Sequence, residues 1–195
     1  MFCTFEGLDG CGKTTQAQLL AESLTADGVE VVSTREPGGT PLGEEIRDLV
    51  LHGDHIAPWA ETALYLAARA QHVDQVIRPT LARGATVVCD RYLDTSVAYQ
   101  GGGRELGVET VLELNLLAVG GLVPDRTFLV EVDVETALAR VGDKRDRIEQ
   151  AEAEFWPRVV EAYRDLAARY PERYVVVDGR RPAQEVAEEI RERLR

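Results

Sequence analysis

The stretch FEGLDGCGKTTQ, residues 5–16, decides how the rest of the chain is interpreted. It fits the spacing GxxxxGK[ST], with Gly7, Gly12, Lys13 and Thr14 at the fixed positions. A strand-like run precedes it and a helical pattern follows, which is the context in which such a loop binds phosphate groups. The stretch therefore predicts a nucleotide site. The residues expected to form it are Gly7, Leu8, Asp9, Gly10, Cys11, Gly12, Lys13, Thr14 and Thr15.

Each part of this loop has an expected task. The glycines let backbone amides curl around phosphate oxygens, Lys13 reaches the terminal phosphates and Thr14 can hold magnesium. Cys11 is expected to be a small residue that fills the loop, although a thiol at a helix N-terminus can also have a lowered pKa. The loop predicts that a nucleotide binds, but it does not indicate which reaction the nucleotide undergoes.

Short β-rich runs alternate with longer helical patterns along the chain. The expected strands are Phe2–Glu6, Val29–Thr34, Ala85–Asp90, Arg126–Asp133 and Tyr174–Asp178, and the expected helices lie near 13–26, 41–52, 59–83, 107–119, 135–140, 150–170 and 182–194. This order predicts an α/β fold with a five-stranded parallel sheet and helices on both faces. With 195 residues and no linker, we expect a single domain over 1–195.

Composition excludes several classes of partner. A formal net charge of -12 argues against an extended basic surface, so we expect neither a nucleic-acid polymer nor an anionic membrane as a partner. No apolar run is long enough to span a bilayer, and we expect a cytoplasmic protein. The cysteines Cys3, Cys11 and Cys89 lack CxxC spacing, which favours reduced thiols.

Charged residues stand at the carboxyl ends of two predicted strands, where ligands bind in such sheets. Arg35 ends the second strand before a Pro-Gly-Gly turn, and Arg47 follows on a helix that could equally present it to solvent. Asp90 and Arg91 end the third strand. They form either an ordinary ion pair or a site in which Asp90, near Thr14, accepts a magnesium-bound water and Arg91 binds a second phosphate.

The helical pattern over 59–83 suggests the wall of a second pocket. Tyr65 and Arg69 share one face, so Tyr65 can stack on a planar ring while Arg69 donates to its edge; alternatively, Arg69 only extends to solvent. The segment DTSVAYQGGG, residues 94–103, adds Ser96, Tyr99 and Gln100, although its composition is also that of a polar helix–loop junction. The helix is apolar on more than one face, which suggests a partner subunit.

A basic segment, ARVGDKRDRIEQ, interrupts two helical patterns at residues 139–150. It is either a solvated turn or a basic lid over about 141–149 that supplies positive charge and excludes water. Its candidate cations are Arg140, Lys144, Arg145 and Arg147.

Taken together, these motifs resemble the thymidylate kinase family, enzymes of the P-loop kinase fold that transfer the γ-phosphoryl group of ATP to dTMP. FEGLDGCGKTT, TREPGG, YLAAR, DRYLDTSVAYQGGG, DRIE and VVVDGRRP occur in the family's order across essentially the whole chain. The chain has Tyr65 where members often have Phe, a slightly shorter lid, and Gly10 where some members have arginine. The last feature resembles the bacterial type, whose catalytic cation comes from the lid.

The resemblance implies roles for residues at the matching positions. Arg35 and Arg91, assisted by Arg47, would hold the acceptor phosphate, and Asp9 would face the acceptor sugar. Tyr99 would exclude a ribose 2'-hydroxyl, Arg180 would lie beside adenine, and a cis peptide would join Glu36 to Pro37. The residues implied for dTMP are Asp9, Arg35, Glu36, Arg47, Tyr65, Arg69, Arg91, Ser96, Tyr99 and Gln100.

The resemblance also implies Mg²⁺, held through Thr14 and Asp90. The surplus apolar surface of the helix over 59–83 predicts a homodimer. Catalysis would rest on Lys13, Arg91 and a lid cation without a general base, because the acceptor phosphate is already anionic. Three alternatives stay open at this point. Another nucleoside monophosphate kinase would keep the loop and change the base pocket. A GTPase switch would carry an NKxD-type motif, which we do not find, and a partition-type ATPase would expose a basic surface.

Overall fold

The computed structural model describes residues 1–142, 147–148 and 154–194, and its centre is a parallel sheet of five strands. The strands are β1 (Phe2–Glu6), β2 (Val31–Arg35), β3 (Thr86–Asp90), β4 (Arg126–Glu131) and β5 (Tyr174–Asp178), in the spatial order β2-β3-β1-β4-β5. The predicted α/β class and five-stranded parallel sheet are confirmed, with strand ends shifted by one or two residues.

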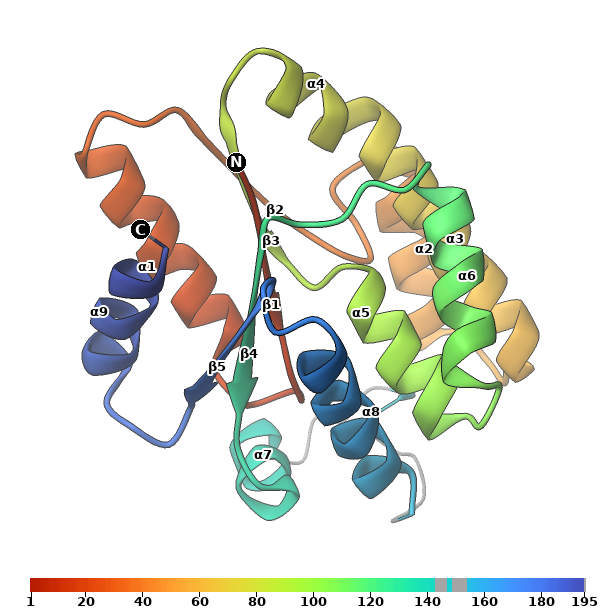
Figure 1. The fold of residues 1–195 in the computed structure, drawn as a ribbon. Coiled ribbons are helices and arrows are strands. Elements are labelled where there is room, and N and C mark those ends of the chain that lie inside the picture. Colours follow the sequence, from red (N-terminus) through yellow and green to blue (C-terminus); the bar gives the residue numbers. More distant parts are fainter. Residues whose placement is uncertain (143–146, 149–153, 195) are drawn as a thin grey trace.

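Helices cover both faces of this sheet (Figure 1). The helices α1 (Lys13–Ala26) and α9 (Ala183–Arg193) contact each other on one face. The other elements are α2 (Pro41–His52), α3 (Pro58–His72), η1 (Val73–Ile77), α4 (Arg78–Ala82), α5 (Leu93–Ser96), η2 (Val97–Gly103), α6 (Val108–Ala118), α7 (Val134–Val141) and α8 (Phe155–Arg169). Among these, α3, α5, α6 and α8 lie beyond the opposite face (Figure 1).

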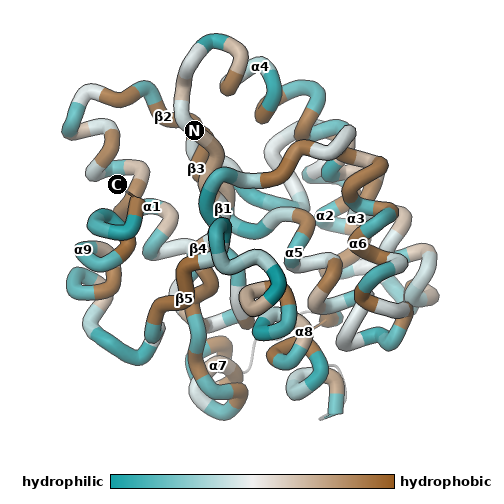
Figure 2. The backbone as a smooth tube through the Cα atoms, viewed as in Figure 1, coloured by the Kyte–Doolittle hydropathy of each residue, from teal (hydrophilic) through white to brown (hydrophobic). Residues whose placement is uncertain are grey.

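The central strands are buried because helices shield both of their faces. Every residue of β1 is buried, and Phe5 stacks on Phe128 of β4 with ring centroids 5.1 Å apart. Figure 2 shows hydrophobic stretches running along these strands. Continuous apolar runs of this kind are typical of parallel sheets covered on both sides.

Strand register brings the predicted site together. Phe5 of β1 pairs with Asp90 of β3, and Asp90 also pairs with Arg35 of β2. The glycine loop, the Asp90–Arg91 pair and the turn after Arg35 therefore leave the sheet at one edge. The predicted cis peptide between Glu36 and Pro37 is confirmed in this turn.

The helical run after residue 58 is continuous but changes its hydrogen-bond pattern. The amide of Arg78 donates to the carbonyl of Val73, five residues earlier, and Pro79 follows directly. Proline has no amide hydrogen for the regular pattern, so a π-helical turn at this point accommodates it. The expected single helix over 59–83 is thus α3, η1 and α4.

The segment DTSVAYQGGG is helical from Asp94 to Gly103, where η2 ends and an irregular connection to α6 begins. A Cβ atom on Gly103 would lie 2.4 Å from the Phe155 ring, and one on Gly102 would lie 2.8 Å from Ala162. Gly102 and Gly103 therefore allow the last turn of η2 to approach α8 closely.

No helix among the described residues is both long and apolar enough to cross a membrane.

Candidate active site

The glycine loop between β1 and α1 has the backbone that the sequence predicts. Gly7, Gly10 and Gly12 have φ values of 135°, 80° and 104°, a region that favours glycine. Side chains are also excluded by contact, because a Cβ on Gly10 would lie 2.4 Å from the carbonyl oxygen of Ala137. Lys13 begins α1, is almost fully buried, and its Nζ donates to the carbonyl of Leu8 at 2.8 Å.

Thr14 and Asp90 meet at the mouth of this loop. The Thr14 hydroxyl donates to Oδ2 of Asp90 at 2.5 Å. Oδ1 of Asp90 is buried and, among the residues that the structure describes, has no hydrogen-bond partner. The pair thus offers hard oxygen ligands beside a phosphate loop.

Asp9 and Arg91 form a charged pair between the loop and β3. Nη2 of Arg91 lies 2.6 Å from Oδ1 of Asp9, and Nη1 donates to the carbonyl of Gly7 at 3.2 Å. The guanidinium also lies over the Tyr99 ring, 5.1 Å from its centroid. Burial alone would raise the pKa of Asp9, but Arg91 and Lys13 outweigh it and hold this pKa below its usual value.

Arg91 has an unusual backbone conformation. Its φ is 72°, which non-glycine residues adopt rarely. Its amide donates to the carbonyl of Phe5 at 2.9 Å, so β1 holds the chain in this turn. The strained turn aims the guanidinium at the glycine loop.

Glu6 lies behind this pair, and the sequence reasoning missed it. It is fully buried and accepts hydrogen bonds from the Tyr92 amide at 2.8 Å, the Thr95 hydroxyl at 2.5 Å and the Tyr163 hydroxyl at 3.1 Å. Burial first, and the nearby Asp94 second, raise the pKa of Glu6 to about 7. Its signal in the sequence was a charged residue at the end of an otherwise apolar strand.

A narrow cavity of about 70 Å³ opens beside Asp9 and Arg91. Of the predicted acceptor residues, it brings together Asp9, Glu36, Arg47, Tyr65, Arg91, Tyr99 and Gln100. Pro37, Leu51, Thr95 and Ile148 complete its lining and were not predicted as site residues.

Arg35 lies outside this lining, at the exposed end of β2. Its Nη2 pairs with Oε2 of Glu44 at 2.9 Å, and the other oxygen of Glu44 accepts from the Gly39 amide at 2.9 Å. Arg47 lines the cavity and donates to the carbonyl of Pro37 at 2.9 Å. Both arginines therefore border the turn after Glu36, but only Arg47 faces the cavity.

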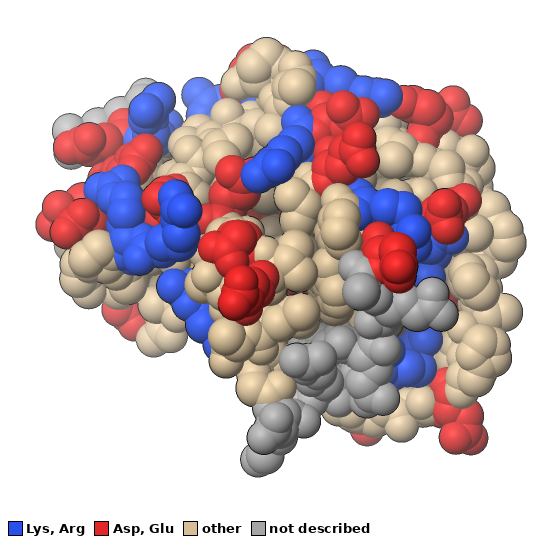
Figure 3. All heavy atoms as spheres, turned by 90° about the horizontal axis from the view of Figure 1, so that it is seen from below, with Lys and Arg blue, Asp and Glu red and all other residues tan. Residues whose placement is uncertain are grey.

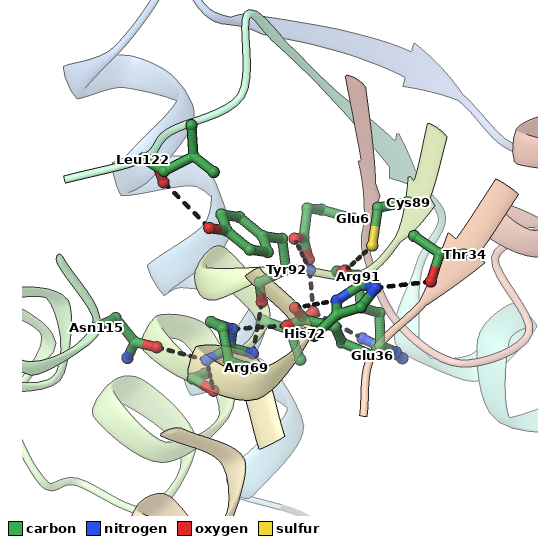
Figure 4. A network of polar contacts seen from close by, with 12 residues as sticks. Glu6, Thr34, Glu36, Arg69, His72, Cys89, Arg91, Tyr92, Asn115 and Leu122 are labelled. Atoms are coloured by element: carbon green, nitrogen blue, oxygen red, sulfur yellow. Dashed lines mark hydrogen bonds and ion pairs between the residues drawn. The ribbon is translucent and has the colours of Figure 1, made fainter. Parts of the chain in front are cut away.

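Arg69 differs most from its predicted position, because it lies behind the cavity wall and not on it. It is almost fully buried, and Nε donates to Oε2 of Glu36 at 2.6 Å (Figure 4). Its other donors reach the Ser96 hydroxyl at 2.9 Å, the Tyr92 carbonyl at 3.0 Å and the side chain of Asn115. The guanidinium therefore donates to groups of the protein itself through Nε, Nη1 and Nη2.

His72 completes this buried network from α3. Its Nδ1 lies 2.8 Å from Oε1 of Glu36, and Nε2 lies 2.7 Å from the Thr34 hydroxyl (Figure 4). Arg69 and His72 thus hold both carboxylate oxygens of Glu36 from behind. No local sequence pattern indicates that these residues converge.

The described cations of the basic segment lie on different sides of the site. Arg140, on α7, donates to the carbonyl of Gly179 at 3.0 Å and of Gly10 at 3.4 Å, so it touches the glycine loop. Arg147 lies on the cavity side, where its Nη2 is 2.6 Å from Oε2 of Glu61. Lys144 and Arg145 lie outside the described residues.

Two further predictions concern the nucleotide side. Arg180 follows β5 and pairs with Asp178 through Nε at 2.8 Å, next to the Gly179 carbonyl that Arg140 contacts.

Burial raises the pKa of the Cys11 thiol more than Lys13 lowers it, so the alternative of a lowered thiol pKa is wrong. Cys11 instead fills the loop as a buried side chain.

Figure 3 looks at the molecule from below, toward the edge where the strands end in Figure 1. Basic and acidic side chains are interspersed over this face. The basic side chains therefore form no continuous surface on this face, as expected for a ligand that is a small anion rather than a polymer.

Comparison with known proteins agrees with this geometry. The thymidylate kinase family model matches residues 5–190. The thymidylate kinase of Leifsonia xyli subsp. xyli is 56% identical over 199 aligned residues, covering 100% of this chain and 94% of that protein. That of Synechococcus sp. is 50% identical, covering 97% and 93%.

A solved structure leads to the same family. The crystal structure of thymidylate kinase from Ehrlichia chaffeensis matches with a TM-score of 0.83 and 36% identity, covering 100% of this chain and 98% of that one. The chain therefore belongs to the thymidylate kinase family.

Proposed function

We propose that the glycine loop holds ATP while the cavity beside Arg91 holds dTMP. The reaction itself is that of the family, transfer of the γ-phosphoryl group of ATP to dTMP. The proposal rests chiefly on the position of Asp9. It belongs to the phosphate loop, pairs with Arg91 and lines the second cavity, so one side chain borders both sites.

On the ATP side, residues 7–15 would cradle the phosphates, and Lys13 would neutralise charge on the transferred group. Arg180 and the Gly179 carbonyl would border adenine. Arg140 on α7 donates to carbonyls of both the glycine loop and Gly179. We propose it, with Lys144, Arg145 and Arg147 as the other candidates, for charge stabilisation in a lid over about 141–149.

Magnesium fits the residues at the mouth of the loop. Thr14 and Asp90 supply oxygen ligands, and the unpartnered Oδ1 of Asp90 is a buried acceptor that a cation or its water shell would satisfy. Mg²⁺ bound there would neutralise charge on the ATP phosphates. Few protein ligands are needed, because Mg²⁺ usually keeps waters and substrate phosphates in its shell.

On the acceptor side, Arg91 and Arg47 would hold the phosphate of dTMP and Arg35 would join them from the end of β2. Tyr65 would stack on thymine, Tyr99 would lie against the sugar, and Gln100 would bind the base edge. Arg69 would act from behind the wall, where it donates to Ser96 and holds Glu36, which lines the cavity. No general base is required, so catalysis rests on alignment of the two substrates and on positive charge around the transferred group.

We also propose that the chain acts as one domain and as a homodimer. Large hydrophobic side chains are exposed on three neighbouring helices: Leu42 and Leu49 on α2, Trp59 on α3 and Leu117 on α6. A second copy would bury this surface by the usual two-fold arrangement.

A turnover panel tests the base preference. We expect kcat/KM to be modestly higher for dTMP than for dUMP, since one methyl group contributes roughly 1 kcal/mol. It should be higher by large factors than for UMP, CMP, AMP and GMP, because a mismatched base leaves buried polar groups unpaired. Comparable kcat/KM for dTMP and CMP would contradict the proposed pocket.

A further inference from the structure

We propose that Glu61 is a positioning residue that fixes the orientation of the Gln100 side-chain amide and so selects thymine over cytosine. This inference rests on the proposed function, in which the cavity lined by Gln100 receives the acceptor base.

Glu61 lies on α3, one turn before Tyr65, and is completely buried. Its Oε2 accepts from Nη2 of Arg147 at 2.6 Å and from Nη2 of Arg104 at 3.3 Å. Its Oε1 accepts from Nε of Arg104 at 3.4 Å and from Nε2 of Gln100 at 2.9 Å. Two guanidinium groups therefore hold a carboxylate against the end of the Gln100 side chain.

A carboxylate has only acceptors to offer. Gln100 must therefore turn its NH₂ group toward Glu61, which leaves its oxygen on the opposite side. The opposite orientation would place Oε1 of Gln100 against Oε1 of Glu61, where two acceptors repel each other. The position of Glu61 thus determines what Gln100 presents on its other side.

On that other side, Gln100 presents an unused acceptor. Its Oε1 is buried and, within the part of the chain that the structure describes, has no hydrogen-bond partner. Gln100 lines the acceptor cavity. A buried acceptor without a partner is costly, so a ligand that brings a donor to it is favoured.

Thymine and cytosine differ at ring nitrogen N3, which carries a hydrogen only in thymine. Thymine carries a hydrogen on ring nitrogen N3 and can donate to Oε1 of Gln100. Cytosine has an unprotonated N3, which would place a second acceptor against Oε1. To accommodate cytosine the Gln100 amide would have to rotate, and Glu61 prevents that rotation.

The test is Glu61→Gln, assayed for kcat/KM with dTMP and with dCMP. A glutamine at position 61 can donate or accept, so both amides can rotate together and Gln100 can donate to N3 of cytosine. We expect the dTMP to dCMP ratio to fall about tenfold or more, chiefly because turnover of dCMP rises. A merely structural role would lower both activities and raise neither. An unchanged ratio, or equal losses for both nucleotides, would overturn the proposal.

Three controls make the outcome specific. Glu109→Gln removes the same charge from an exposed residue of α6 that pairs with Arg169, and should leave the ratio unchanged. Glu61→Asp keeps an acceptor-only group, so it should keep the thymine preference even if activity falls. Wild type assayed in parallel separates the two proposals, because a wild type without thymine preference contradicts the proposed pocket itself.

An exchange variant covers the case in which Glu61→Gln does not fold. Glu61→Gln combined with Gln100→Glu retains the same charge and the same donor–acceptor pair, and it still presents an oxygen to the cavity. We expect this double variant to prefer dTMP over dCMP. A double variant that prefers dCMP would overturn the proposal.

Discussion

Three charged side chains at this site have different positions and different expected roles: Asp9, Lys13 and Arg91. Lys13 is buried in the phosphate loop, Arg91 faces the acceptor cavity, and Asp9 contacts both cations. The carboxylate therefore balances two positive charges that would otherwise repel each other in a space with little water. The two cations have different expected tasks, so replacing each should change different kinetic constants.

Lys13→Ala and Arg91→Ala should both reduce turnover, by different routes. Lys13→Ala should chiefly lower kcat, by about 10²-fold or more, because it removes charge stabilisation from the transferred group. Arg91→Ala should also raise KM for dTMP. Steady-state kinetics with each substrate varied separately distinguishes the two results, with thermal unfolding as the control for folding. Full activity in either variant would contradict the assigned roles.

Glu6 should make stability depend on pH. Its pKa of about 7 exceeds the unfolded value of about 4.5, so the folded state keeps a proton that the unfolded chain has lost. This contribution to the free energy of unfolding is present below about pH 4.5 and is lost as pH rises to 7, by about 3 kcal/mol in total. Glu6→Gln should flatten the fall measured by denaturant unfolding between these pH values. A variant with the same slope as wild type would show that Glu6 is ionised throughout.

At the scale of elements, the approach of η2 to α8 shapes the acceptor side. Gly102 and Gly103 allow this contact, and Phe155 and Trp156 at the start of α8 pack against the Tyr99 ring with centroids 5.9 Å and 6.2 Å away. Tyr99 in turn lies under the guanidinium of Arg91. The distance between two helices thus affects the position of Arg91, which we propose binds the acceptor phosphate.

Gly103→Ala should destabilise the protein by about 1–3 kcal/mol, because its Cβ would overlap the Phe155 ring. KM for dTMP should rise more than KM for ATP, since the displaced element carries Tyr99 and Gln100. Chemical denaturation and kinetics measure the two effects. In Phe155→Leu the ring is removed, so adding Gly103→Ala should cost less there; an equal cost in both backgrounds would show that the ring is not the obstacle.

For the whole molecule, the exposed apolar surface over α2, α3 and α6 contrasts with a strongly acidic chain. Leu117 is 78% exposed and Trp59 is 50% exposed, although a net charge of -12 keeps separate molecules apart through repulsion. Association would have to gain enough from apolar burial to outweigh that repulsion.

Light scattering should therefore give a mass of about twice 21.5 kDa at micromolar concentration. Leu117→Glu should shift the protein toward the monomer, because it would bury a charge in the contact. Val176→Glu, which introduces the same charge at an exposed residue of the edge strand β5, should leave the mass unchanged. A wild-type monomer under these conditions would contradict the proposed dimer.

The sequence by itself determined the parallel α/β fold and much of the candidate site. The spacing of Gly7, Gly12, Lys13 and Thr14 implies its own local geometry, and the alternation of strands and helices places strand ends at one edge. Such features depend on neighbours in the chain, so a sequence pattern is sufficient to predict them.

Only the tertiary structure decided which residues far apart in the chain form hydrogen bonds with each other. Arg69 was predicted on the cavity wall but lies behind it, because Glu36, Ser96 and Asn115 come from three other segments and together use its donors. Glu61 and Gln100 lie 39 positions apart, and nothing local to either indicates their hydrogen bond. Gly102 and Gly103 are needed because α8, more than 50 residues later, packs against them, and no local pattern indicates that contact. Buried polar groups must find partners wherever packing brings them, and packing involves the whole chain at once.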